Sequence, residues 1–454
     1  MSSLMTHTGH ARAILVLGLP LIGGHLAQFA IGLTDTVMLG WYGVDALAGI
    51  TLAHSYFFVF FMLGSGFAMA VMPLVAHGLA LGDDRAVRRS TRMGLWLSVL
   101  YALIIMPLMW WSAPILGLLG QVESVADDAA RYLRVAGLGL IPALLVMVLK
   151  SYLAAQERTQ VVLWITVLAA ITNALANYAL IFGNWGAPEL GLQGAAIASV
   201  CTQTVALVAV VIYVLRVLPE HDLFRRLWRP EPEMMARVFR LGVPIGLTTV
   251  AEISLFAMSA IMMGWLGTVP LAAHGIVITI ASGTFMIHMG LGNVATIRAG
   301  NALGRGDRAH LARGAAMVSL LSLAFAALTS VAFITVPEPL ISVFMDGDDP
   351  QRGAILAIGT TLLALAALFQ LVDGAQAVAL GLLRGVQDTT VPMFVAVVAY
   401  WAIGIPACYV LGFVLGWGGV GVWLGLVAGL ACAGVFLMLR FWRRNVVRPV
   451  AVAA

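Results

Sequence analysis

Hydrophobic and polar positions alternate along this chain in long blocks. Mainly apolar runs of about 20 residues or more recur, and each ends at charged residues or at a Gly- or Pro-rich break. Because a helix needs about 20 apolar residues to cross a bilayer, each run is long enough to span one. The pattern predicts twelve spanning helices, at 13–39, 46–80, 93–113, 132–155, 161–183, 192–216, 236–265, 271–303, 314–336, 353–386, 391–415 and 418–441.

Composition supports a membrane protein. Of the 454 residues, 61% are hydrophobic and 10% are charged, whereas a soluble chain carries about 25% charged residues. Most of the surface must therefore face lipid, and we expect an all-α membrane protein. The net charge of +4 does not indicate a nucleic-acid partner, because the arginines lie in short segments between apolar spans.

The arginines predict the orientation in the membrane. They gather after spans two, six, eight and twelve: Arg85, Arg88, Arg89, Arg92, Arg216, Arg225, Arg226, Arg229, Arg237, Arg240, Arg298, Arg305, Arg308, Arg313, Arg440, Arg443, Arg444 and Arg448. The opposite loops hold few arginines and several acids: Arg131, Arg134, Arg352, Glu123, Asp127, Asp128, Glu338, Asp346, Asp348 and Asp349. Since cytoplasmic loops are enriched in Lys and Arg, both termini are predicted to be cytoplasmic.

An internal repeat divides the chain. Residues 17–83 align without a gap onto 241–307, with 16 identities in 67 positions, where shared composition would give roughly six. We therefore predict two six-helix bundles, 1–216 and 236–454, joined by a cytoplasmic connector at 217–235. Each half has six spans, so both enter the membrane in the same direction. Such parallel repeats are typical of transporters, whose substrate site lies between the halves.

Two acids near the middle of spans in the second half are candidate functional residues. Glu252 lies in the seventh predicted span and Asp373 in the tenth. Charged side chains inside a membrane are costly and usually face a cavity or a partner. Two carboxyl groups that share a buried site do not readily ionise together. Such a pair could hold a proton, a sodium ion or a cationic substrate in turn, although a structural hydrogen-bonded role is the alternative.

A second polar cluster is expected in the first half. Asp35 follows Pro20 in span one, and Pro20 removes a backbone donor and can bend the helix. Asn173 and Asn177 share one face of span five, and Thr202 follows in span six. With Asp35 these residues could form an oxygen-rich cation site. The alternative is that Asn and Thr only join neighbouring helices.

Several motifs resemble the multidrug and toxic compound extrusion (MATE) family over roughly residues 10–445. They are TDTVMLGWYG at 34–43, the Ala251-Glu252 pair, VDGAQAVALGLLRGVQDTT at 372–390 and GLQGAAIAS at 191–199. The acid pair resembles the NorM-like branch, in which these positions carry the cation site of the C-terminal lobe. The DinF-like branch lacks this pair and relies on the aspartate of the first span.

The resemblance implies a site and a mechanism. Asp35, Asn173, Asn177 and Thr202 match the polar cluster of the N-terminal lobe. Phe369 stands where some NorM-like members have tyrosine, and Asn177 stands where some DinF-like members have aspartate, so the coupling ion stays open between Na⁺ and H⁺. The family implies a V-shaped pair of bundles that alternates access and exports amphipathic, often cationic, compounds.

Competing functions differ in the charges they require. A lipid-linked oligosaccharide flippase of the same superfamily is the runner-up; such flippases tend to have a cationic cavity, whereas the intramembrane charges identified in this sequence are acids. An enzyme is not indicated, because no nucleophile–base or metal-binding pattern occurs. Without a Walker A sequence, ATP is not an expected partner, and no cofactor is expected beyond the coupling ion. We expect a monomer in a bacterial cytoplasmic (inner) membrane, acting on small-molecule drugs.

Overall fold

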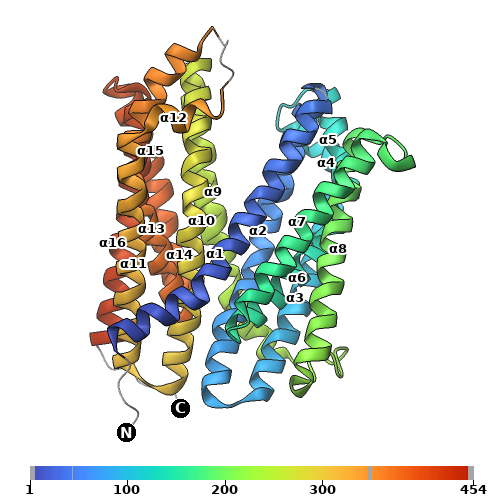
Figure 1. Ribbon diagram of the computed structural model, residues 1–454, viewed down its shortest axis with the longest axis vertical. Coiled ribbons are helices and arrows are strands. Elements are labelled where there is room, and N and C mark those ends of the chain that lie inside the picture. The colour runs from blue at the N-terminus through green and yellow to red at the C-terminus, as the bar shows by residue number, and fades with distance from the viewer. Residues whose placement is uncertain (1–5, 43, 346–349, 448–454) are drawn as a thin grey trace. The chain divides into compact units, whose positions relative to one another are not determined.

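The computed structural model describes residues 6–42, 44–345 and 350–447 (Figure 1). Throughout these ranges every regular element is a helix, and twelve segments are long and apolar enough to cross a membrane. The predicted all-α fold with twelve spanning helices is confirmed. Some residues used above lie outside the described ranges: Gly43, Asp346, Asp348, Asp349 and Arg448.

The helices follow one another with short connections. The elements up to the connector are α1 (His7–Tyr42), α2 (Val44–Leu81), α3 (Asp84–Trp110), α4 (Ser112–Leu118), α5 (Glu123–Ala136), η1 (Gly137–Gly139), α6 (Leu140–Ala155), α7 (Thr159–Phe182), η2 (Asn184–Gly186), α8 (Gly191–Val217) and η3 (Pro219–His221). The remaining elements are α9 (Pro232–Trp265), α10 (Thr268–Arg305), α11 (Arg308–Thr335), α12 (Pro337–Ser342), α13 (Arg352–Gly385), α14 (Thr390–Val397), η4 (Val398–Gly404), α15 (Ile405–Tyr409), η5 (Val410–Val414), α16 (Gly418–Phe441) and η6 (Trp442–Val447).

Hydropathy alone placed the start of the third span too late. The sequence pattern predicts Arg85, Arg88, Arg89 and Arg92 between spans two and three, but they lie on α3, which begins at Asp84. Asp83 caps this helix by accepting a hydrogen bond from the Ala86 backbone N–H at 2.9 Å, which satisfies one of the free donors of the first turn. The end of the connector was predicted too late, at residue 235, because α9 begins at Pro232, and proline suits the first helical position.

The chain forms two compact units whose limits fall inside helices. One unit comprises residues 1–22 and 247–454, and the other comprises 23–246. Helices α1 and α9 therefore each contribute residues to both units, whereas the predicted division at 217–235 assigned whole helices to each half. In the first unit, the beginning of α1 and the π-helical η6 lie at the same end (Figure 1).

The two members of the sequence repeat fold alike. Helices α2 and α10 are each followed by a glycine with positive φ, Gly82 at 69° and Gly306 at 65°. Each glycine precedes an aspartate whose side chain caps the next helix: Asp83 accepts from the Ala86 N–H, and Asp307 accepts from the His310 N–H. Glycine adopts this left-handed conformation without the penalty that a Cβ atom brings.

Two glycines that the sequence repeat relates, Gly66 and Gly290, pack against the parts of α9 and α1 that belong to their own compact units. In the unit 23–246, Gly66 of α2 lies so close to Gly246 of α9 that a Cβ atom would overlap its backbone. In the other unit, a Cβ atom on Gly290 of α10 would overlap the side chain of Ile22 in α1 and lie 3.0 Å from its backbone nitrogen. These pairs are equivalent under the 224-residue offset. Small residues allow membrane helices to approach closely and gain van der Waals contact.

Close packing and polar contacts also fix α13 against its neighbours. A Cβ atom on Gly381 would overlap the backbone of Gly292 in α10, and the Thr296 hydroxyl donates to the Gly381 carbonyl at 2.9 Å. Nearer the middle of α13, Gln370 donates to the Thr284 hydroxyl of α10 and accepts from the Thr329 hydroxyl of α11. These contacts hold α13, which carries Asp373, in a defined rotation.

Candidate cation sites

The structure brings the two acids of the second half together. Asp373, on α13, is only 3% exposed, and its charged neighbour is Glu252 on α9. Gln376, one turn after Asp373, donates from Nε2 to Glu252 Oε1 at 3.2 Å. The predicted proximity of Glu252 and Asp373 is therefore present in the fold.

Three buried oxygen atoms of this site, one of them in the acid pair itself, have no hydrogen-bond partner within the described part of the chain: Asp373 Oδ1, Gln376 Oε1 and the Tyr400 hydroxyl. Tyr400 belongs to η4, a π-helical segment of the kind often found at functional sites. A buried polar atom without a partner costs about 1–3 kcal/mol. Such oxygens can be satisfied by a proton, a water molecule or a small hard cation, which prefers oxygen ligands.

A basic group also lies near the acids. Arg384, on α13, interacts electrostatically with Glu252 and with Tyr400. No hydrogen bond or ion pair links the Arg384 side chain to a described residue, so it acts on the acids through its charge. A cation that enters the site meets this positive charge together with two carboxyl groups. The site thus combines two acids, two neutral side chains with free oxygen atoms and one nearby arginine.

Aromatic side chains cover one side of the site. Phe369 precedes Asp373 by four residues, so both lie on the same face of α13. Its ring lies edge-on to Trp423 and Phe256, with centroids 5.7 Å and 5.9 Å away. Trp423 also donates to His274 Nδ1 at 3.1 Å. The phenyl ring carries no oxygen atom, so the side-chain oxygens of the site belong to the acids, Gln376 and Tyr400.

The polar cluster of the first half forms around Asp35. The side-chain amides of Asn173 and Asn177 both donate to Asp35 Oδ1, at 3.0 Å and 2.5 Å. Asn177 also donates to Asn173 Oδ1 at 3.2 Å, while its own buried Oδ1 has no partner among the described residues. All three side chains are buried. The spacing of the asparagines on α7 thus places two donors on one carboxylate.

Two other residues proposed for this half have local roles in the structure. Thr202 is buried, and its hydroxyl donates to the Ala198 carbonyl of its own helix at 2.8 Å. Pro20 lies within α1, which continues through it to Tyr42. A cation-binding role for Thr202 and a functional bend at Pro20 stay predictions.

Basic side chains also lie in spanning helices, so the expectation that the intramembrane charges are acids was wrong. Lys150 on α6 is the sole lysine in the sequence, and its ammonium donates to the Thr166 hydroxyl at 2.8 Å. Arg298 of α10 contacts His10 Nδ1 at 2.8 Å and His310 Nε2 at 3.1 Å. Each of these cations therefore has a polar partner of its own.

Sequence reasoning missed Gln376, Tyr400 and Arg384 as neighbours of the acids. Gln376 offered a usable signal, because it lies three residues after Asp373 and therefore on the same helical face. Tyr400 gave none, since a tyrosine in an apolar span usually marks a membrane interface. Arg384 lies in the motif at 372–390 that resembles the family, but no separate function is predicted for it from the sequence.

Comparisons with known proteins identify the family. The MatE family model matches residues 20–179 and 244–410. A protein of Rhizobium meliloti (strain 1021) named "Probable multidrug resistance protein NorM" is 44% identical over 96% of this chain and 93% of its own length. A protein of the same name from Agrobacterium fabrum is 43% identical over 95% of this chain and 93% of its own length.

Solved structures share the fold at low sequence identity. The chain matches "Crystal structure of MATE in complex with MaL6" with a TM-score of 0.88 and 18% identity, covering 96% of this chain and 97% of the other. It matches "Crystal structure of eukaryotic MATE transporter AtDTX14" with a TM-score of 0.85 and 19% identity, covering 97% and 99%. At these identities the likeness concerns the fold alone.

Proposed function

The chain belongs to the MatE family, and from this membership we propose that it is a secondary active multidrug exporter. In this proposal it exports amphipathic or cationic organic compounds in exchange for H⁺ or Na⁺ moving inward. The names of its bacterial relatives support multidrug transport. The observation that supports ion coupling is the cluster of half-buried Glu252 with buried Asp373 and Gln376.

The cluster suits the exchange of one cation for another. Two neighbouring carboxyl groups in a water-poor site are stabilised when they share a proton or a metal cation. The free oxygens of Asp373, Gln376 and Tyr400 would complete the shell of a small ion. A cationic substrate that competes for the same negative charge would release that ion, and ion binding would in turn release the substrate.

The Asp35 cluster is proposed as a second coupling site. Two amide donors hold one oxygen of the Asp35 carboxylate, which fixes its orientation. Asn177 Oδ1 has no described partner and could join the carboxylate in binding a cation. Thr202 is kept in this proposal as a residue of the adjacent helix α8.

The cellular setting follows from the same proposal. We place the chain in a bacterial cytoplasmic membrane with both termini in the cytoplasm, on the arginine distribution. We propose that it acts as a monomer. The flippase alternative is not favoured, since the curated relatives described above are named multidrug resistance proteins.

Transport by purified protein in proteoliposomes tests the function. A proton gradient and a sodium gradient are imposed separately, and the uptake or release of ethidium is followed by fluorescence. Ethidium movement driven by one gradient, and abolished when that gradient is collapsed, is the expected result. If neither gradient drives any cationic dye while a lipid-linked sugar is moved between leaflets, the antiporter proposal is wrong.

A further inference from the structure

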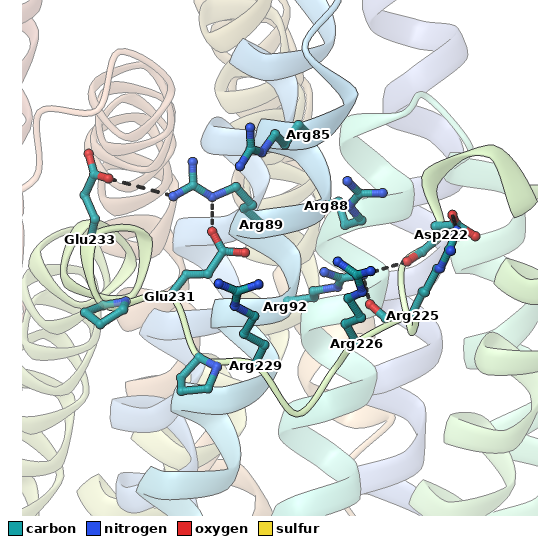
Figure 2. Close-up of a pocket in the computed structure, with 12 residues that line it drawn as sticks. Arg85, Arg88, Arg89, Arg92, Asp222, Arg225, Arg226, Arg229, Glu231 and Glu233 are labelled. Carbon is teal, nitrogen blue, oxygen red and sulfur yellow. Dashed lines mark hydrogen bonds and ion pairs between the residues drawn. The ribbon is translucent and has the colours of Figure 1, made fainter.

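An arginine-rich cavity lies in the unit 23–246, at the ends of α3 and α9 and beside the connector (Figure 2). Its volume is about 580 Å³. Seven arginines and three acids line it, with two prolines: Arg85, Arg88, Arg89, Arg92, Arg225, Arg226, Arg229, Asp222, Glu231, Glu233, Pro230 and Pro232. The lining therefore carries a formal excess of four positive charges. The positive-inside rule requires only that arginines lie on the cytoplasmic side of the membrane. It does not require that they line the same cavity.

Three of the arginines hold the connector in place. Arg89 pairs with Glu231, and Arg92, which is buried, donates from Nε to the Leu223 carbonyl at 2.7 Å. Arg92 also donates to the carbonyls of Asp222 and Arg225. Arg225 pairs with Asp222 at 3.2 Å. These bonds fix the backbone that forms one wall of the cavity.

The other four arginines have no acidic partner. Within the described residues, no hydrogen bond or ion pair involves the side chains of Arg85, Arg88, Arg226 or Arg229, and Figure 2 shows them around the same cavity. Arg88 and Arg226 are close enough to Arg92 to repel its charge. A guanidinium group matches a phosphate with two parallel hydrogen bonds, so a phosphate in this cavity would relieve that repulsion.

The position of the cavity favours a lipid as the source of the phosphate. Arg85, Arg88 and Arg89 lie in the first two turns of the spanning helix α3, where a membrane helix meets the headgroup region. Trp228, next to Arg229, is 76% exposed, and tryptophan prefers the membrane–water interface. A free phosphate would need only the arginines, whereas a lipid would also contact this exposed ring.

We propose that this cavity binds the phosphate group of an anionic phospholipid from the adjoining membrane leaflet. The lipid headgroup lies between the arginines of α3 and those of the connector and so joins the two segments. Arg88 and Arg226 contact the phosphate from opposite walls. The site is independent of the proposed ion exchange, since none of its residues belongs to the acid pair or to the Asp35 cluster.

Native mass spectrometry of the full chain in a nonionic detergent tests the site. The protein is titrated with phosphatidylglycerol, phosphatidylcholine and inorganic phosphate. The variant Arg88→Gln with Arg226→Gln removes two free arginines and no hydrogen bond present in the structure. The control is Arg216→Gln with Arg443→Gln, which removes two exposed arginines outside the cavity.

The expected result is a phosphatidylglycerol adduct whose affinity falls roughly 30-fold in the cavity variant, the effect of two arginine contacts at a membrane surface. The control should keep the affinity, and phosphatidylcholine should bind weakly to every variant. Equal phosphatidylglycerol binding by the cavity variant and the control would overturn the proposal. So would displacement of the lipid by equimolar inorganic phosphate. If the double variant does not fold, Arg85→Gln and Arg229→Gln are compared singly with Arg216→Gln.

Discussion

Gln376 donates to Glu252 Oε1 at 3.2 Å, while its own Oε1 atom is buried and has no partner in the described chain. This side chain thus joins α9 to α13 at the acid pair and presents a free oxygen beside Asp373. Replacing Gln376 by methionine keeps its volume but removes both functions. Because a hydrogen bond to a charged group contributes about 1.5–3 kcal/mol, we expect the coupling ion to bind at least about tenfold more weakly.

Isothermal titration with the coupling ion measures this effect. Gln203→Met, on α8 and in the other compact unit, is the control and should bind the ion as the unmodified protein does. Equal ion affinity in Gln376→Met and Gln203→Met would show that Gln376 has no part in the ion site.

Glu252→Gln and Asp373→Asn should each abolish most ion-coupled export, and the double variant should lose little more. The two carboxyl groups act as one site, and residues that interact in this way give non-additive effects. Proton release on adding substrate or sodium to the purified protein, followed with a pH electrode, measures the site directly. Release that persists in both single variants would exclude the pair from coupling.

Asp35→Asn should impair ethidium export and leave the protein folded. The carboxylate accepts two amide donors, and an asparagine keeps the shape but loses the negative charge that a cation needs. Export in cells is compared with the amount of folded protein, measured by size-exclusion chromatography. Export at the unmodified rate would assign Asp35 a structural role.

Gly381→Ala should destabilise the protein, because the new Cβ atom would overlap the backbone of Gly292 and separate α13 from α10. Forced overpacking costs about 1–3 kcal/mol. Gly275→Ala, in α10, is the matched control, since its Cβ atom meets nothing within 4 Å. Thermal unfolding in detergent should show a lower Tm for Gly381→Ala only. An equal Tm in both variants would contradict the close packing.

The predicted orientation can be tested with single cysteines. After the native Cys201, Cys408 and Cys432 are replaced, Glu220→Cys in the connector should react with a membrane-impermeant maleimide only in broken cells. Glu338 is exposed in the first turn of α12, so Glu338→Cys should react in intact cells. The reverse pattern would place both termini outside.

The number and type of helices could be predicted because spanning segments must be long and apolar. The ends of the helices could not be predicted in this way. Arg92, for example, is a charged residue that hydropathy excludes from a span, but in the structure it is buried on α3 and donates to a connector carbonyl. Helical spacing predicted that Asn173 and Asn177 share one face, whereas their proximity to Asp35 was expected from the resemblance to the family. The bonding of Gln376 and the position of Tyr400 could not be predicted, because they depend on how α9, α13 and η4 pack.

The packing of Ile22 against Gly290 also constrains how the protein is made. The ribosome synthesises α1 first. Its initial segment packs against α10, which is synthesised only after residues 23–246. The beginning of α1 must therefore wait in the membrane without its final neighbour while residues 23–246 are assembled. Two half-chains cut at the connector would each carry a segment that belongs to the other compact unit, so neither fragment could complete its own tertiary structure in isolation.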